Sequence, residues 1–278
     1  MTFPQGSTLN VDHLNEDGHM RLLNDRRNVL SKILTALTII LVSGTTACCS
    51  LGHRVDSQPV SSNPHESFIF VLHKAHIKSC SGNACIQGLR VSSGSGFSVA
   101  NVGGHTLAVT AGHLCAPEPN VYKQEYTVTV LGGDTFKAHP LMTVGSTDTC
   151  VLVVEGAEVP PVRIADTGPE RGERVYALSA PYGIFDPNMI PMFEGFYSGY
   201  TTKDTPPGGI VSRMDLDAYT IPSRPGSSGG PIINSRGEVI GMVVMAHPGF
   251  ENYTLSPRQQ ALREILRIVV MISRSNAS

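Results

Sequence analysis

Three short motifs in this chain carry residue types that together could perform nucleophilic catalysis. His113 follows one apolar run, Asp148 precedes another, and Ser228 lies within the glycine-rich segment Gly226–Pro231. Cleavage of an acyl bond requires a nucleophile, a base, a carboxylate that orients the base, and donors for the oxyanion. We therefore predict a triad of nucleophile Ser228, general base His113 and orienting acid Asp148. The backbone N–H groups of Gly226 and Ser228 are the predicted oxyanion hole.

Each motif also has a simpler explanation. A histidine in a turn, an aspartate at the start of a strand, or a Ser/Gly loop would usually be incidental if it stood alone. The pattern G-x-S-x-G around Ser228 also fits the nucleophile elbow of α/β-hydrolases, which must lead directly into a helix. The segment after Ser228, residues 231–240, instead has the pattern of strand, turn and strand. We therefore favour an all-β fold over an α/β fold.

Short apolar or alternating runs recur between turn signals from residue 67 onward, which predicts a sandwich or barrels. The runs are 68–72, 96–100, 106–110, 126–131, 150–154, 174–178, 193–197, 218–221, 230–233 and 239–245. A break near 157–169 divides them into two halves. Beyond them, Ser256 and Pro257 have the pattern of an N-cap and a first helical residue. We expect a C-terminal helix over 257–273, packed on the second half.

These motifs resemble the trypsin/chymotrypsin superfamily, and within it the HtrA-like bacterial peptidases. The matching segments, in the right order, are Ser93–Phe97, Ala180–Gly183 and Pro225–Pro231. The resemblance covers about residues 67–246 within a protease domain of 67–278. It implies a chymotrypsin-like double six-stranded β-barrel, with a first barrel over about 67–158, a second over about 159–255, and the triad between them. Because a short helical tail follows the second half, we expect no PDZ domain.

The resemblance also implies which residues line the primary specificity pocket, namely those just before the nucleophile and those on the strand after it. These positions are Pro222, Ser223, Val243, Val244 and Met245. None is the acid that specificity for Lys or Arg requires, and a valine stands where glutamate-specific relatives place a histidine. We therefore predict cleavage after medium-sized apolar residues such as Val, Ala, Leu or Met.

Four cysteines follow the N-terminal leader, and four cysteines allow three pairings. Cys80 and Cys85 enclose a turn-forming tetrapeptide, while Cys115 and Cys150 each lie two residues after a predicted catalytic residue. We predict disulfides Cys80–Cys85 and Cys115–Cys150, as is common in exported proteins. A zinc site remains the alternative, with the ligands His73, His76, Cys80 and Cys85.

The N-terminal residues 1–49 have the pattern of a signal peptide or membrane anchor. A basic region precedes the apolar run 33–42, and small residues follow it. Thr45–Cys48 resembles a lipoprotein processing site, so Cys48 is a candidate for lipidation and a membrane tether. Residues 50–66 are polar and Pro/Ser-rich, which is typical of a linker. We expect an extracytoplasmic protein that is secreted, periplasmic or membrane-anchored.

The composition narrows the classes of partner. A net charge of −2 gives no reason to expect nucleic acid, and the sequence has neither a phosphate-binding loop nor an HExxH motif. We expect polypeptide substrates, no cofactor and no metal. The favoured function is a serine endopeptidase that forms an acyl-enzyme on Ser228. The alternatives are a membrane-tethered pseudoprotease that acts as a binding module, and an esterase on the same fold.

Overall fold

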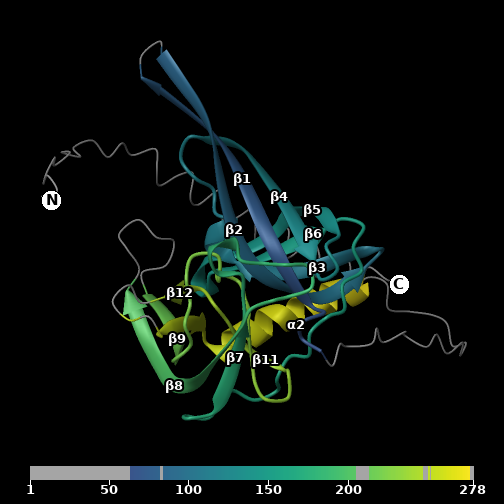
Figure 1. Cartoon of the computed structure of the whole chain (residues 1–278), viewed down its shortest axis with the longest axis vertical. Coiled ribbons are helices and arrows are strands. Elements are labelled where there is room, and N and C mark those ends of the chain that lie inside the picture. Colours follow the sequence, from purple (N-terminus) through teal and green to yellow (C-terminus); the bar gives the residue numbers. More distant parts are fainter. Residues whose placement is uncertain (1–62, 82–83, 205–212, 247–249, 251, 276–278) are drawn as a thin grey trace, which may run out of the picture. The chain divides into compact units, whose positions relative to one another are not determined.

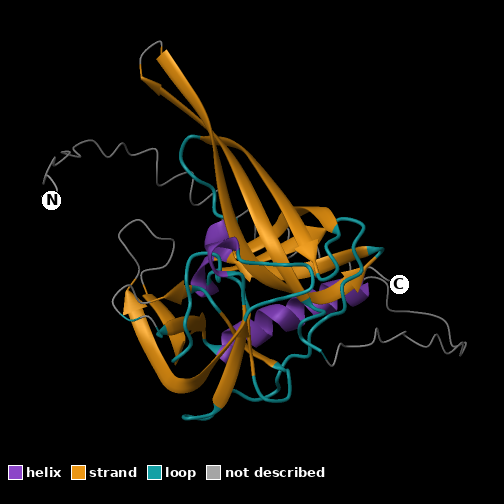
Figure 2. Cartoon of the chain, viewed as in Figure 1, coloured by secondary structure: helices purple, strands orange, loops and turns teal. Residues whose placement is uncertain are grey.

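The computed structural model describes residues 63–81, 84–204, 213–246, 250 and 252–275 (Figure 1). Strands dominate this part of the chain, and one long helix lies near its C-terminus (Figure 2). The predicted leader 1–49, with its lipidation candidate Cys48, and residues 50–62 of the predicted linker lie outside the described residues.

The first half is a closed barrel with the strand order β1-β2-β3-β6-β5-β4. Its strands are β1 (Phe68–Ser81), β2 (Ala84–Val102), β3 (His105–Ala111), β4 (Val121–Val130), β5 (Thr135–Val144) and β6 (Thr149–Val154). Apolar side chains from alternate positions, among them Ile69, Val71 and Leu152, are fully buried in one cluster. The alternation read from the sequence therefore predicts this core correctly, because successive side chains of a strand point to opposite faces.

Strand β5 was not among the expected strands. It contains Pro140, which cannot donate a ladder hydrogen bond and argues against a central strand. The structure accommodates the proline at a register shift between Pro140 and Met142 in the pairing of β5 with β6. A bulge is one of the few places where a sheet tolerates proline, and this explains why the sequence pattern misses the strand.

The second half is a seven-stranded sheet in the order β11-β10-β7-β8-β9-β13-β12. Its strands are β7 (Arg174–Leu178), β8 (Met192–Asp204), β9 (Arg213–Tyr219), β10 (Pro231–Ile233), β11 (Val239–Met242), β12 (Met245–Ala246) and β13 (Thr254–Pro257). Seven strands replace the expected six: the run 239–245 is split between β11 and β12, at opposite edges of the sheet, and β13 was not among the expected runs. The peptides of Val243 and Val244 connect the two edges, since Val243 N–H donates to Gly230 O and Val244 N–H to Leu255 O.

The C-terminal helix α2 spans Gln259–Ser275. The expected N-cap at Ser256 is wrong, because Ser256 and Pro257 complete the buried strand β13. Ser256 Oγ accepts a hydrogen bond from Met242 N–H, and the first helical N–H, that of Gln259, donates to Asp217 Oδ2 at 2.8 Å. A carboxylate from a distant strand therefore satisfies the helix start, as a local cap otherwise would.

From the sequence we expected helix α2 to pack on the second half alone. In the structure it packs on both halves. Its buried residues Leu262, Leu266 and Val269 share one hydrophobic cluster with Val99 and Leu107 of the first barrel. The same cluster includes residues of β11 and β13 in the second half. The helix thus contributes apolar burial between the two halves. Within the described part of the chain, no helix is both long enough and apolar enough to cross a membrane.

Candidate active site

His113 and Asp148 form a close pair at one end of the first barrel. His113 lies in the short 3-10 helix η1 (Gly112–Leu114) directly after β3, and Asp148 follows the 3-10 helix η2 (Gly145–Thr147). One carboxylate oxygen of Asp148 lies 2.7 Å from His113 Nδ1, and the other accepts the backbone N–H of His113 at 2.7 Å. A carboxylate can only accept, so Nδ1 carries the proton and Nε2 of the neutral ring is left as an acceptor.

Gly112 makes this approach sterically possible. Its N–H donates to Asp148 O at 2.7 Å. A Cβ on Gly112 would lie 2.8 Å from the carbonyl carbon of Asp148 and 2.9 Å from Thr149 N. Both atoms are backbone and cannot move aside cheaply. The residue before His113 therefore has to be glycine for the carboxylate to reach the imidazole in this geometry.

Two features support the loop that carries His113. The first is the disulfide between Cys115 and Cys150, which links this loop to the strand after Asp148. The second is Tyr126, a buried barrel residue whose hydroxyl lies 3.2 Å from Leu114 O and 2.7 Å from Gln124 Oε1. Burial raises the pKa of Tyr126 to about 12, so the phenol remains a neutral donor.

The structure also forms the second predicted disulfide, Cys80–Cys85, near the tip of the β1–β2 hairpin. These two sulfur atoms were part of the alternative zinc set, and the disulfide removes them as thiolate ligands. The two histidines of that set have other contacts. His73 stacks on Tyr126 with ring centroids 4.6 Å apart, and His76 Nε2 lies 3.1 Å from Glu125 Oε2.

The loop with Ser228, between β9 and β10, lies against the end of β3. Ser95 N–H donates to Ser228 O at 2.8 Å. A Cβ on Gly229, whose φ is +87°, would lie 2.8 Å from the backbone nitrogen of Ala111, two residues before His113. The nucleophile candidate and the imidazole therefore come from adjacent backbone segments. Among the described residues, none forms a hydrogen bond with Ser228 Oγ, so this hydroxyl is uncommitted.

The peptide before Gly226 is held in one orientation. The Pro225 carbonyl accepts the N–H of Tyr182, which lies in the turn η3 (Pro181–Gly183) with a left-handed φ of 55°. In a trans peptide the carbonyl and the following N–H point in opposite directions. The N–H of Gly226 is thus directed away from that turn. No described residue accepts a hydrogen bond from the N–H of Gly226 or of Ser228, whereas the intervening Ser227 N–H donates to Arg224 O.

Ser95 is a site residue that the sequence analysis did not identify individually. It is fully buried on β2. Its Oγ donates to Gly226 O at 2.9 Å and accepts the N–H of Ala180 at 2.9 Å. With the backbone bond to Ser228, one residue of the first barrel connects to both ends of the nucleophile loop. Its only sequence signal is its place in the segment Ser93–Phe97, one of the segments that resemble the HtrA-like peptidases.

The predicted pocket residues fall into two groups. Pro222 and Met245 are partly exposed, whereas Ser223, Val243 and Val244 are buried. Val243 and Val244 belong to two different hydrophobic clusters, so their side chains pack in the core. Thr254 Oγ1 donates to Ile221 O at 2.6 Å and lies 2.8 Å from Ser223 Oγ. Thr254, on β13, was not predicted, because nothing in the sequence indicates which residue of that strand faces Ser223.

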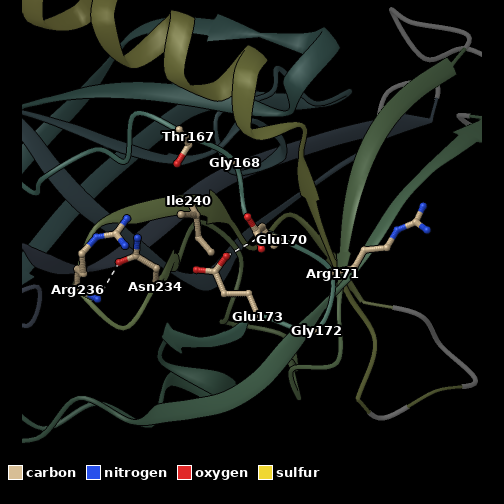
Figure 3. Close-up of a pocket in the computed structure, with 9 residues that line it drawn as sticks. All are labelled: Thr167, Gly168, Glu170, Arg171, Gly172, Glu173, Asn234, Arg236 and Ile240. Carbon is tan, nitrogen blue, oxygen red and sulfur yellow. Dashed lines mark hydrogen bonds between the residues drawn. The ribbon is translucent and has the colours of Figure 1, made fainter.

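A separate cavity of about 500 Å³ lies between the segment before β7 and the β10–β11 hairpin (Figure 3). Its lining is polar, and Glu170 N–H donates to Glu173 Oε2 at 2.9 Å. No predicted catalytic or pocket residue lines this cavity. The lining residues are Thr167, Gly168, Glu170, Arg171, Gly172, Glu173, Asn234, Arg236 and Ile240.

Sequence comparison places this site within a region shared with known proteins. A family model described as a trypsin-like peptidase domain matches residues 94–242. A probable periplasmic serine endoprotease, DegP-like, from Marinomonas sp. (strain MWYL1) is 28% identical over 162 residues, which are 56% of this chain and 30% of the relative. The serine protease Do-like HtrB of Bacillus subtilis (strain 168) is 34% identical over 122 residues, 42% of this chain and 26% of the relative. The chain spans less than a third of the length of these relatives.

Solved structures share the fold at lower identity. The active form of the Rv3671c protease from M. tuberculosis has a TM-score of 0.55 at 19% identity, over 78% of this chain and 92% of that one. The HtrA-type protease AlgW, solved with a decapeptide, has a TM-score of 0.56 at 16% identity, over 76% of this chain and 66% of that one. At these identities the likeness concerns the architecture, and it agrees with the all-β fold predicted from the strand pattern.

Proposed function

Because the chain belongs to the trypsin-like peptidase family, we propose that it is a serine endopeptidase with Ser228, His113 and Asp148 as its catalytic triad. The observation that carries this proposal is the two-point contact of Asp148 with His113, at Nδ1 and at the backbone N–H, beside the Ser228 loop. This contact fixes both the tautomer and the orientation of the imidazole. An ion pair with a purely structural role on the surface would need neither a fixed tautomer nor a fixed orientation of the imidazole.

The first half of the reaction acylates Ser228. The hydroxyl oxygen attacks the carbonyl carbon of the scissile peptide bond, and its proton passes to His113 Nε2. The negative charge that develops on the carbonyl oxygen is stabilised by the N–H groups of Gly226 and Ser228, which have no acceptor among the described residues. The C–N bond then breaks, and the leaving amine takes the proton from His113. The products of this half are a free amine and an ester on Ser228.

The second half releases the acyl group. A water molecule gives a proton to His113 Nε2 while its oxygen attacks the ester carbon, and the same two N–H groups bind the oxyanion. Collapse of this intermediate returns the proton to Ser228 Oγ and frees a carboxylic acid. Asp148 keeps the proton of Nδ1 hydrogen-bonded throughout and stabilises the imidazolium.

Labelling with a fluorophosphonate tests the proposal directly. Stoichiometric labelling of Ser228, together with peptide hydrolysis, is the expected result. Ser228→Ala should lower the turnover number by about 10⁶, and Asp148→Asn by about 10⁴ through the wrong tautomer of His113. A folded protein that is neither labelled nor active would instead support the pseudoprotease alternative. Near-normal activity of Asp148→Asn would refute the assignment of the acid.

We further propose cleavage after medium-sized apolar residues. The support is that the two partly exposed predicted positions, Pro222 and Met245, carry no charged side chain. A methylene group in an apolar pocket changes the transition-state free energy by only about 1–3 kcal/mol, so the preference should be graded. Profiling with a peptide library decides this point. Dominant cleavage after Lys, Arg, Asp or Glu would refute the proposed pocket but not the triad.

We also propose an extracytoplasmic location, with a membrane tether through the N-terminal segment or a lipid on Cys48. The support is the leader pattern, the two disulfides, and the word periplasmic in the names of relatives. Mass spectrometry of the mature N-terminus tests it. A start near residue 48 with an added lipid mass is expected for the lipoprotein form, and an intact Met1 in a cytoplasmic fraction would refute export.

A further inference from the structure

The hairpin formed by β1 and β2 extends beyond the other strands of the first barrel (Figure 1). On one side, β1 pairs with β4 only as far as Ile77, opposite Val121. On the other side, β2 pairs with β3 only from Gly96 onward, so residues 84–95 form a free sheet edge. Among the described strands, residues 78–81 and 84–87 therefore pair only with each other. Four residues of a strand span about 13 Å, which is the length of this projecting tip.

The hairpin is basic, although the net charge of the chain is −2. Between Glu66 and Glu118 the sequence contains Lys74, Lys78 and Arg90 but no aspartate or glutamate. Arg90 forms an ion pair with Glu118. Lys74 and Lys78 have no carboxylate partner among the described residues. They are four residues apart on one strand and so lie on the same face. This face therefore carries two uncompensated positive charges, which attract an anionic partner.

Exposed apolar side chains lie on both faces of the hairpin. Ile86 is 78% exposed, Leu89 56% and Val91 52%. Leu89 and Val91 are two residues apart and share a face, whereas Ile86, three residues from Leu89, lies on the opposite face. The register places Val91 directly across from Lys74, so apolar and basic side chains are mixed on one of the two faces. Exposed apolar groups gathered on a projecting element are typical of a surface that binds a partner.

A lipid surface fits this distribution better than a folded protein partner. A flat protein surface covers one face of a hairpin, whereas the headgroup layer of a membrane surrounds a hairpin tip on both faces. Amphipathic segments at a membrane interface bury their apolar groups about 5–10 Å deep, which the projecting tip can reach. At this depth water and headgroups still bond the backbone groups of the free edge. The hairpin therefore lies at the surface and does not enter the hydrocarbon core.

We propose that the β1–β2 hairpin docks on an anionic lipid surface, with Lys74 and Lys78 at lipid phosphate groups and Ile86 in the interfacial layer. This inference goes beyond the peptidase function and does not depend on it. It adds a second membrane contact to the proposed N-terminal tether. The chain from Cys48 to Phe68 can extend to about 66 Å, whereas the 14 residues of β1 span about 46 Å. A lipid on Cys48 and the hairpin tip can therefore reach the same membrane.

A tryptophan reporter tests this proposal, because the chain contains no tryptophan of its own. The full-length Ile86→Trp variant is mixed with phosphatidylcholine vesicles that contain or lack phosphatidylglycerol. With phosphatidylglycerol we expect a blue-shifted emission and quenching by lipids brominated on their acyl chains, and high salt should reduce both. Phe196→Trp is the control, because Phe196 is 45% exposed on β8 in the second half of the fold. Its emission should change little.

Charge variants in the reporter background locate the contact. A lysine near an anionic membrane strengthens binding about fivefold. Lys74→Gln combined with Lys78→Gln should therefore lower the docking equilibrium constant, taken from the quenched fraction, about 30-fold. Lys123→Gln is the matched control, because the ammonium group of Lys123 already pairs with Glu125. Circular dichroism verifies that each variant is folded.

Three outcomes would overturn the docking proposal. The first is an unshifted and unquenched emission of Ile86→Trp on vesicles with phosphatidylglycerol. The second is equal quenching of Phe196→Trp, which would show that the contact is not made by the hairpin. The third is binding of an acidic polypeptide that the two lysine substitutions weaken, without quenching by lipid, which would assign the hairpin to a protein partner. The fluorescence readout requires no hydrolysis, so failure of this proposal and failure of the peptidase assignment are distinguishable.

Discussion

Replacing Ser95 by alanine probes how far the first barrel positions the oxyanion hole. The substitution removes the hydrogen bond from Ser95 Oγ to Gly226 O and the one from Ala180 N–H to Ser95 Oγ, both 2.9 Å long and buried. Each partner is left without this bond in a buried environment, at a cost of about 1–3 kcal/mol. We therefore expect the free energy of unfolding to fall by about 2–6 kcal/mol.

The catalytic effect should exceed what destabilisation alone produces. The carbonyl of Gly226 belongs to the loop whose N–H groups bind the oxyanion, so the loop loses one of its two connections to β2. Removal of a whole oxyanion donor lowers kcat by about 10²–10³-fold. Because Ser95→Ala loosens the donors without deleting them, we expect kcat to fall about tenfold to hundredfold with little change in KM.

Ser98→Ala is the matched control. Ser98 lies on the same strand, is equally buried, and donates from Oγ to Val159 O at 2.9 Å, far from the nucleophile loop. Asn101 Nδ2 also donates to Val159 O, so that acceptor remains satisfied and the cost should be about 1 kcal/mol. The assay compares kcat, KM and affinity for a peptide aldehyde, normalised to the folded fraction from circular dichroism. Equal kcat in the two folded variants would refute a positioning role for Ser95.

Three other perturbations have expected outcomes. Gly112→Ala places a Cβ 2.8 Å from the Asp148 carbonyl carbon and should lower kcat about hundredfold by displacing His113, whereas unchanged kinetics would contradict the steric argument. Loss of the Cys115–Cys150 disulfide, which closes a separation of 35 residues, should lower the free energy of unfolding by about 4 kcal/mol in urea titrations, and an intact stability would show that the crosslink constrains little. Burial lowers the pKa of His73 below its ordinary value of 6.5, with Glu118 opposing and Arg90 reinforcing the shift. The unfolded chain therefore takes up this proton first, so the Tm should decline as pH falls through 6.5, and His73→Phe should flatten that decline.

The sequence alone was sufficient for features that depend on local pattern. Alternating apolar residues predict most strands, because a strand with one buried face must repeat with a period of two. The Cys115–Cys150 pairing could be predicted since each cysteine lies two residues from His113 or Asp148, and the disulfide is present in the structure. The identities of the triad candidates also depend on short motifs. Their roles remain proposals that the geometry supports.

Tertiary structure decided the features that join distant segments. Ser95 and Gly226 are 131 residues apart, and no local pattern indicates that a buried hydroxyl on β2 meets that carbonyl. The start of helix α2 depends in the same way on Asp217 from a distant strand, so a plausible local N-cap at Ser256 was misleading. The free edge of β2 exists only because β3 ends its pairing at Gly96. A sequence can specify that a residue is in a strand, but which neighbour pairs with it is decided by the closure of the whole sheet.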